Sequence, residues 1–363
     1  MTLGHCRLAR VRWIAAAACI LLSVSGCGGN GGGRPTVAKG EAAVLFDLDE
    51  PKIAEHRPGY RRHDLVTAVA TLQGGTEADI LVRSDEGMIF QLLDGNDATS
   101  PSMSDDLAPG GIIFDSDGLL YIAHGMGITA DGIFPGVRHE RRQGIPEPVL
   151  RYPDDTSITA ADVALAGDSV LIATRPIDTG AENSSLTPFS GPTAVPVDVQ
   201  ILSVPRAGGD PTVVAGIGRG CTTAPTSAAD AQFSDLRGIV VDEHGVVLVA
   251  DPVCHQVYEI DDGMVRPLLP PGDIHSPIDV TVAGEEVFVA DYSTRQVLRL
   301  AADGREPEVF LDAAEDELNP RPVDLGTVAR AEVGLIRPRS VSLIGTHHLL
   351  VTDSRRVLLV STR

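Results

Sequence analysis

Short apolar runs separated by turn residues follow one another along most of this chain. In each run Val, Ile, Leu or Phe recurs at alternate positions, and paired runs are separated by two to four residues that include Gly. Alternation of this kind predicts β-strands, and the short turns predict hairpins. Six stretches share the plan: 111–123, 238–251, 279–291 and 340–353, with fainter copies at 162–174 and 79–92. The pattern therefore predicts six similar hairpin units.

Neighbouring runs extend these hairpins into larger sheets. Third strands are expected at 255–261, 295–304 and 355–361, and the runs 211–216 and 306–311 can supply a fourth strand. A four-stranded antiparallel sheet repeated about six times is the plan of a β-propeller. We therefore expect an all-β, six-bladed propeller over residues 43–363, in which 43–49 pairs with 356–361 and closes the ring. Segments 133–148, 177–196 and 312–337 are rich in Pro, Gly or charge and are expected to be insertions.

The first residues have the order of a secretory signal. Three arginines at positions 7, 10 and 12 precede an apolar run over 13–22 and then small residues up to Cys27. The string Val-Ser-Gly-Cys at 24–27 resembles the bacterial lipobox. This resemblance implies that Cys27 carries lipid, that residues 1–26 are removed, and that the protein is anchored to the outer, extracytoplasmic face of the cell membrane. Residues 27–42 are glycine-rich and would form a flexible tether.

Two other interpretations of this segment stay open. A transmembrane anchor is one, although the apolar run spans about ten residues and a membrane-crossing helix needs roughly 20. An ordinary signal that is cut slightly later, with Cys27 as a bystander, is the other. No later segment is long and uninterruptedly apolar.

The composition predicts a hydrophobic core and an acidic surface. The chain has 43% hydrophobic and 22% charged residues, which is ample for a folded domain. It carries 29 Lys and Arg against 50 Asp and Glu, a formal net charge of −21. This balance argues against nucleic acid and against close contact with anionic lipid headgroups, because both are polyanions.

Cysteine usage fits an exported protein. Cys6 and Cys19 lie in the predicted signal and Cys27 is the lipid site, so Cys221 and Cys254 remain for the folded part. Two cysteines in an oxidising compartment can pair. We expect a disulfide between them, and two separate buried thiols are the alternative.

One unit carries a family resemblance. Residues 215–261 resemble an NHL repeat, with Asp242, Gly245, Ala250 and Asp251 in family positions. Arg237 stands in the position before the glycine where the family pattern has Pro-x-Gly, and Cys254 replaces the usual Asn. The resemblance implies an NHL-like six-bladed propeller, but it implies no activity, because fold and function are separable. Asp242 and Gly245 are expected to shape a turn, and Asp251, Asp291 and Asp353 to cap turns at strand ends.

Candidate site residues come from the starts of the innermost strands, which face the central channel of a propeller. The aligned starts are Gly111, Asp162, Gly238, Asp279 and Ser340, with Arg237 and Arg339 beside two of them. Asp162, Asp279, Arg237, Arg339 and Ser340 are therefore the possible channel-lining residues. Asp162 and Asp279 are weak candidates for holding Ca²⁺ or another divalent ion, since calcium prefers several oxygen ligands. No cofactor is otherwise expected.

Other catalytic patterns are missing from the sequence. It contains no Gly-x-Ser-x-Gly, His-Glu-x-x-His, Cys-x-x-Cys or Gly-Lys-Ser/Thr. His347 and His348 are expected in a turn, and His124 occupies the loop position that Asp takes in sister units. Propeller lactonases and related hydrolases, which this chain distantly resembles in its number of blades, carry a Glu/Asn/Asp cluster at the channel mouth, and that set is not found here in register.

These observations favour a non-catalytic binding or scaffold module for an envelope protein, peptide or glycan, with no catalytic residues. The alternative is a metal-dependent propeller hydrolase or lactonase with a divalent ion in the channel. A sensor domain that acts through a membrane partner is a third hypothesis.

Overall fold

The computed structural model describes ranges of the chain that lie within the compact unit Gly32–Arg363. They are 36–47, 65–73, 77–84, 88–92, 98–103, 109–115, 120–129, 132–140, 147–151, 158–176, 198–207, 210–300, 306–314, 327–354 and 356–363. The predicted signal, Cys27 and the expected insertion at 177–196 lie outside them. Among the described residues, no helix is long and apolar enough to cross a bilayer.

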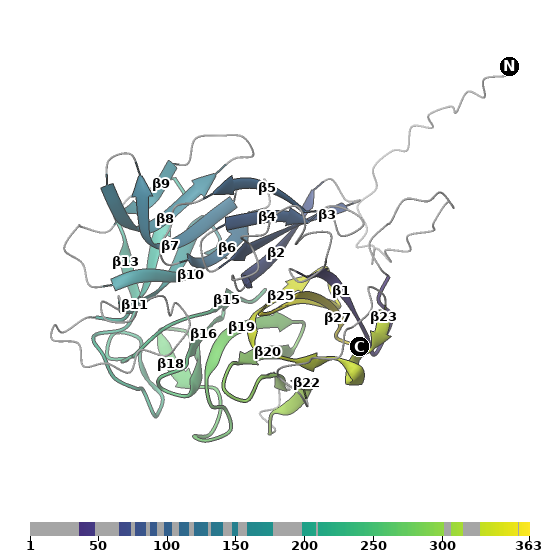
Figure 1. The fold of residues 1–363 in the computed structure, drawn as a ribbon. Helices are drawn as coiled ribbons and strands as arrows, with labels where there is room; N and C mark the ends of the chain where they lie inside the picture. Colours follow the sequence, from purple (N-terminus) through teal and green to yellow (C-terminus); the bar gives the residue numbers. More distant parts are fainter. Residues whose placement is uncertain are drawn as a thin grey trace, which may run out of the picture. The chain divides into compact units, whose positions relative to one another are not determined.

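The described strands form six sheets, three with four strands and three with five (Figure 1). The first sheet holds β2 (Leu65–Gln73), β3 (Glu77–Ser84), β4 (Met88–Leu92) and β5 (Ala98–Met103). The second holds β6 (Pro109–Phe114), β7 (Leu120–Thr129), β8 (Gly132–Glu140) and β9 (Glu147–Arg151). The third holds β10 (Ile158–Ala166), β11 (Ser169–Pro176), β12 (Ile201–Pro205) and β13 (Thr212–Ala215).

The other three sheets each have a fifth strand. The fourth sheet holds β15 (Ile239–Val241), β16 (Val247–Asp251), β17 (Gln256–Asp261), β18 (Met264–Pro267) and β14 (Thr226–Ser227). The fifth holds β19 (Pro277–Ala283), β20 (Glu286–Asp291), β21 (Gln296–Leu300), β22 (Glu308–Ala313) and β24 (Gly334–Leu335). The sixth holds β25 (Pro338–Ile344), β26 (His348–Asp353), β27 (Arg356–Ser361), β1 (Glu41–Asp47) and β23 (Thr327–Ala329). A short 3₁₀-helix, η2 (Arg330–Glu332), follows β23.

In five of the six hairpin units the first strand is the innermost strand of its sheet, whereas the unit at 79–92 forms β3 and β4 and the innermost strand there is β2. These inner strands contact one another in a closed cycle, from β2 to β6, β10, β15, β19 and β25 and back to β2. Such a ring of antiparallel sheets is an all-β propeller, so the prediction of an all-β propeller fold is confirmed.

Two details of the prediction are wrong. Four strands per sheet does not hold for the fourth, fifth and sixth sheets, because short segments (β14, β24 and β23) pair with edges that would otherwise be open. The stretches 133–148 and 312–337 are not plain insertions, since the first contributes to β8 and β9 and the second to β22, β23 and β24. Their Pro and Gly content, which is unusual in strands, hid these strands in the sequence.

The ring closes where the two ends of the described chain meet. β1 pairs antiparallel with β27, and Ala42 lies opposite Val360. The Gly40 N–H donates to the Arg363 carbonyl at 2.9 Å. The expected closing pair of strands is thus present, and β1 begins at Glu41, two residues before the predicted domain boundary.

Turn chemistry follows the sequence in the best-matched unit. Asp242 Oδ1 accepts hydrogen bonds from the N–H groups of His244 and Val246, both at 2.8 Å. Gly245 has φ +86°, a backbone conformation that residues with a Cβ rarely adopt. The expected role of these two residues in shaping a turn is confirmed.

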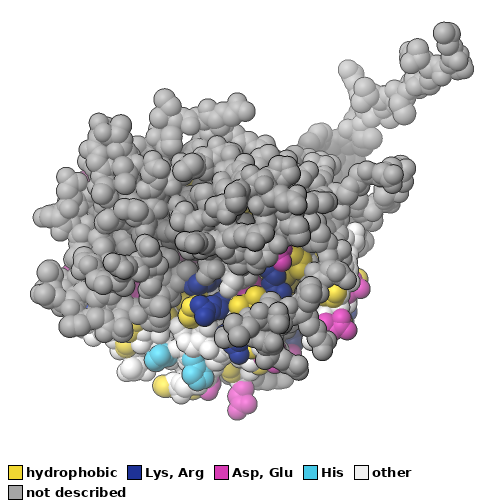
Figure 2. Space-filling model, viewed as in Figure 1, with side chains coloured by type: hydrophobic (Ala, Val, Ile, Leu, Met, Phe, Trp, Pro, Cys, Tyr) yellow, Lys and Arg dark blue, Asp and Glu magenta, His cyan; other side chains and the backbone are white. Residues whose placement is uncertain are grey.

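Basic side chains are unevenly distributed on the described surface. Figure 2 shows Lys and Arg gathered beside apolar side chains near the middle of the face in view, with Asp and Glu nearer its margin.

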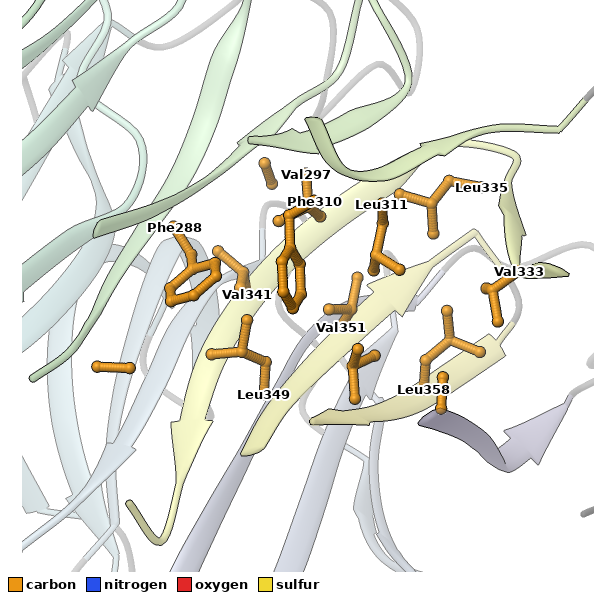
Figure 3. Packing of buried hydrophobic residues seen from close by; sticks show 14 of the residues in the cluster. Phe288, Val297, Phe310, Leu311, Val333, Leu335, Val341, Leu349, Val351 and Leu358 are labelled. Carbon is orange, nitrogen blue, oxygen red and sulfur yellow. The ribbon is translucent and has the colours of Figure 1, made fainter. Parts of the chain in front are cut away.

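The core lies between neighbouring sheets. Between the fifth and sixth sheets, Phe288 and Phe310 meet edge to face with ring centroids 4.9 Å apart. Val341, Leu349 and Val351 face them from β25 and β26 (Figure 3). Similar buried clusters lie between the second and third, the third and fourth, and the fourth and fifth sheets. Apolar burial between sheets thus holds the inner strands in place, at roughly 25 cal/mol per Å² of apolar surface.

Candidate active site

Irregular pairing at the start of the inner strands creates the candidate site. The register shifts between Ala160 and Asp162 in β10, and again between Pro277 and Asp279 in β19. A bulge leaves one extra residue on the inner strand and re-aims the side chain that follows it. Ser340 follows the same kind of shift in β25. The structure thereby places Asp162, Asp279 and Ser340 at equivalent positions, as their alignment in the sequence predicted.

Asp162 joins three sheets. Its Oδ1 accepts a hydrogen bond from the Val163 N–H at 2.8 Å, and its Oδ2 accepts one from the Ile239 N–H of β15 at 2.9 Å. On the other side lies Gly111 of β6, where an added Cβ would stand 1.5 Å from Asp162 Oδ1. A glycine is required at position 111 because the carboxylate occupies the space that a side chain would take.

Asp279 repeats this arrangement two sheets further on. Oδ1 accepts from the Val280 N–H and Oδ2 from the Val341 N–H of β25, both at 2.8 Å. A Cβ added to Gly238 of β15 would lie 2.1 Å from Asp279 Oδ1. Gly238 and Ile239 therefore lie between the two aspartates, which we call the carboxyl pair.

The carboxyl pair is poorly solvated. Both residues keep some accessible surface, yet protein atoms enclose the carboxyl groups closely enough that burial is the largest cause of their shifts. Burial raises the pKa of Asp162 to about 7, although the hydrogen bonds from Ile239 and Val163 oppose the change. Burial, and then the charge of Asp162, raise the pKa of Asp279 well above its usual range. The pair therefore retains a proton near neutral pH.

Arg237 and Arg339 occupy the positions just before Gly238 and Ser340. The guanidinium of Arg237 donates from Nε and Nη2 to Asp235 Oδ2, at 3.1 and 2.8 Å. That of Arg339 lies over the Tyr292 ring, 4.8 Å from its centroid. Neither guanidinium is among the groups that shift the pKa of the carboxyl pair. The two arginines are thus positive neighbours of the site, one bonded to Asp235 and the other stacked on Tyr292.

Sequence reasoning missed Asp235 and Tyr292. Asp235 bonds Arg237 and Tyr292 contacts Arg339, and the sequence contained a signal for each of them. Asp235 lies two residues before Arg237, and Tyr292 directly follows the strand-end Asp291. Only the contact between sheets shows that Tyr292 meets Arg339 of the next unit.

Ser340 is aligned with the carboxyl pair but is engaged within its own sheet. Its hydroxyl lies 3.0 Å from that of Thr352 on β26, and the residue is 3% exposed. The structure therefore gives Ser340 a role in holding β25 to β26.

The described side chains do not fit a metal site. No group of three His, Cys, Asp or Glu side chains is arranged to hold a metal ion in the described part of the chain. The carboxyl pair offers two carboxylates, and each of their oxygens already accepts a backbone N–H. A divalent ion such as calcium takes six to eight oxygen ligands. The carboxyl pair alone therefore supplies fewer ligands than such an ion takes.

The strand-end aspartates cap turns, as predicted. Asp251, Asp291 and Asp353 are fully buried. Asp291 accepts four backbone hydrogen bonds, from His275, Ser276, Ser293 and Thr294. Asp353 accepts from Ile336 and Arg337 N–H and pairs with the Arg356 side chain. These carboxylates satisfy amides of the loops that enter and leave each sheet.

Cys221 and Cys254 form the expected disulfide, with their Cα atoms 5.4 Å apart. His347 and His348 lie in and beside the β25–β26 turn, and their rings have different partners: His347 meets Arg363, and His348 Nε2 lies 3.1 Å from the Val37 carbonyl oxygen. This separation agrees with the turn interpretation. His124 lies on β7 opposite Pro109.

Comparison with known proteins identifies the fold and no family. No protein-family model and no curated protein matches the chain. A gluconolactonase from Xanthomonas campestris is similar in structure, with 9% identity, a TM-score of 0.56, and 93% of this chain and 99% of that one covered. A luciferin-regenerating enzyme aligns with 14% identity and a TM-score of 0.55, over 83% of this chain and 92% of its own.

A third neighbour is the aldose sugar dehydrogenase of Streptomyces coelicolor, solved with PQQ bound. It aligns with 16% identity and a TM-score of 0.52, and 90% of this chain and 99% of that one are covered. At these identities the likeness shows the propeller fold alone.

These neighbours correct the leading expectation about function. The sequence favoured a non-catalytic binding or scaffold module, and that prediction is wrong, because the solved propellers that resemble this chain are enzymes. The expectation failed because it relied on missing motifs. A pair of carboxyl groups on separate inner strands has no motif in the sequence.

Proposed function

We propose that this chain is a propeller hydrolase that cleaves a carboxylic ester or lactone, with Asp162 as general base and Asp279 as general acid. The observation that carries the proposal is the carboxyl pair itself. Two titratable groups lie on the inner strands β10 and β19, on either side of β15, and the pKa of each is raised. Two carboxyl groups that retain a proton between them can supply the base and the acid of one reaction.

The reaction follows from that assignment. Ionised Asp162 accepts a proton from a water molecule as the water oxygen forms a bond to the carbonyl carbon. Protonated Asp279 donates its proton to the leaving oxygen as the C–O bond breaks, which releases an acid and an alcohol. Proton transfer from Asp162 to solvent, and from solvent to Asp279, restores the pair. General acid–base catalysis by placed carboxyl groups contributes about 10² to 10⁴ in rate.

The fold supports the proposal in two ways. The gluconolactonase of similar structure acts, by its name, on a lactone. The inner strands that carry Asp162 and Asp279 are held by packing on both sides, so the two acids lie on rigid elements. We further infer that each of the six sheets is one blade of an NHL-like propeller, because the inner strands form one cycle.

The experiment is a screen of purified protein against p-nitrophenyl esters and lactones, with pH-indicator detection of released acid. Asp162→Asn and Asp279→Asn should each lower kcat at least about 100-fold. Asp168→Asn is the matched control, since Asp168 is exposed in the turn between β10 and β11. Dialysis against a chelator should leave activity unchanged. Equal activity in all three variants, or activity that depends on an added divalent ion, would overturn the proposed chemistry.

We also propose a place for the enzyme, from residues outside the described part. Cys27, at the end of the lipobox-like string, carries lipid and holds the propeller at the outer face of the cell membrane. The test is mass spectrometry and membrane fractionation of the chain and its Cys27→Ala variant. The variant should lose the acyl mass and leave the membrane fraction. An unmodified Cys27 in membrane-bound protein would contradict the anchor.

A further inference from the structure

The segment from Ser234 to Ile239 connects two buried carboxylates. At its start, Asp251 Oδ2 accepts hydrogen bonds from the N–H groups of Ser234 and Asp235, at 2.7 and 3.3 Å. At its end, the Ile239 N–H donates to Asp162 Oδ2 at 2.9 Å. Six residues thus link a strand-end cap to the carboxyl pair, and we call them the bridge segment.

Asp251 also anchors the chain on its other side. Its Oδ1 accepts from the N–H groups of Val253 and Cys254, at 3.1 and 3.0 Å. One carboxylate therefore holds together the segment that leads to the bridge and the segment that carries Cys254. Burial raises the pKa of Asp251 to about 6, and the charge of nearby Asp235 raises it as well.

The Cys221–Cys254 disulfide joins the same two segments by a covalent bond. Cys221 belongs to the loop that precedes the bridge segment, and the Gly220 carbonyl of that loop accepts from the Ser234 hydroxyl at 3.0 Å. The Thr222 hydroxyl and the Gln232 backbone exchange two further hydrogen bonds, at 2.8 and 3.1 Å. Cys221 is exposed, so a reductant can reach the disulfide.

Asp235 connects the anchored loop to the candidate site. Its side chain is 1% exposed, and its Oδ2 receives both donors of Arg237, two residues further along the bridge segment. Arg237 is followed directly by Gly238, which touches Asp279, and by Ile239, which bonds Asp162. The order along the chain is therefore disulfide loop, Asp235, Arg237 and carboxyl pair.

We propose that the Cys221–Cys254 disulfide is a redox switch for the carboxyl pair, and that Asp235 and Asp251 are the positioning residues that carry its effect along the bridge segment. This inference rests on the proposed function only in naming the pair as catalytic. A dithiol reductant supplies two electrons and two protons, the S–S bond breaks to give two thiols, and the reductant is oxidised to its own disulfide. The loop then loses its covalent tie, and the bridge segment is held by its hydrogen bonds and by the packing of Leu236 and Ile239.

The expected change has a definite sign. Loosening the bridge segment lengthens the bond from the Ile239 N–H to Asp162, and that bond lowers the pKa of Asp162. Reduction should therefore raise the pKa of Asp162 further, and the acid limb of the pH–activity profile should move to higher pH. Charged groups near this change include Asp279 across the pair, and Asp235 with Arg237 on the bridge segment.

The test compares oxidised protein, protein reduced with a phosphine, and the Cys221→Ser/Cys254→Ser variant. Hydrogen exchange of amides 234–239 should quicken about tenfold or more in the last two, while amides of β20 and β21 exchange as before. The pH profile of activity should move upward with reduction and return on reoxidation. Asp251→Asn, which keeps the disulfide, should also quicken exchange in the bridge segment.

Unchanged exchange at 234–239 after complete reduction would overturn the inference. Exchange can be measured in the absence of any activity, so a failure of the proposed hydrolysis is distinguishable from a failure of the switch. If the double serine variant does not fold, reduction of the folded wild type gives the same comparison. Altered exchange with an unchanged pH profile would show a structural staple and would likewise exclude the switch.

Discussion

Two sets of aspartates lie at different places in the sheets: the strand-end residues Asp251, Asp291 and Asp353 on second strands, and the carboxyl pair on inner strands. The strand-end residues, represented by Asp291, accept four backbone N–H groups from loops of their own unit. The carboxyl pair, Asp162 and Asp279, accepts two N–H groups per residue, one of them from the next sheet. Four donors let a strand-end carboxylate fix the loops on both sides of it. The carboxyl pair has fewer donors and little solvent, and its pKa values are raised, which makes it available for proton transfer.

The largest expected effect separates these two roles. Asp279→Asn should lower kcat about 100-fold or more, because it removes the proton donor, while the midpoint of thermal unfolding stays close to that of the wild type. Asp291→Asn should do the reverse and lower the free energy of unfolding by about 2 to 4 kcal/mol, since an amide cannot accept from four N–H groups. Enzyme kinetics and urea unfolding of both variants make the comparison. Loss of activity and stability together in both would remove the distinction.

A smaller effect is expected from the glycines that border the pair. Gly238→Ala places a Cβ 2.1 Å from Asp279 Oδ1 and 2.6 Å from its Cα, so β15 and β19 must move apart. Overpacking of this kind lowers the free energy of unfolding by about 1 to 3 kcal/mol. Urea unfolding measures it, and Ser340→Ala serves as the control at the equivalent position of the sixth sheet. A Gly238→Ala protein as stable as the wild type would show that the aspartate is not held against the strand.

Ser340→Ala itself should have a modest effect. The serine hydroxyl bonds Thr352 within one sheet, so its loss should lower the free energy of unfolding by about 1 kcal/mol and leave kcat within about twofold. Kinetics of this variant also test the site. A large drop in kcat would mean that Ser340 takes part in the reaction.

The last expected effect is in the dependence of stability on pH. Because the pKa of Asp162 is raised to about 7, the folded state binds more protons than the unfolded chain between about pH 4 and pH 7. The stability of the wild type relative to Asp162→Asn should therefore be greatest below about pH 4 and fall as pH rises through this window. Urea unfolding of both proteins at three pH values measures the difference. A difference that rises with pH would place the pKa of Asp162 below its ordinary value.

Much of the fold could be read from local pattern. Alternating apolar positions predicted the inner hairpins at 162–174, 279–291 and 340–353, because each hairpin is closed by its own turn. The segments β8 and β24 were missed, since their Pro and Gly content resembles a loop. The turn roles of Asp242 and Gly245 were likewise local and were predicted correctly.

The features of the candidate site likewise divide into those that the sequence predicted and those that only the structure revealed. The sequence by itself determined which positions are equivalent among the units, and so it named Asp162, Asp279, Arg237, Arg339 and Ser340. It also identified the two cysteines that can pair. Only the tertiary structure decided that Ile239 donates to Asp162, that Val341 donates to Asp279, and that Gly111 and Gly238 leave room for the two carboxyl groups. The physical reason is that desolvation and hydrogen bonding between sheets depend on neighbours dozens of residues away, whereas repeat pattern and turn chemistry depend on neighbours along the chain.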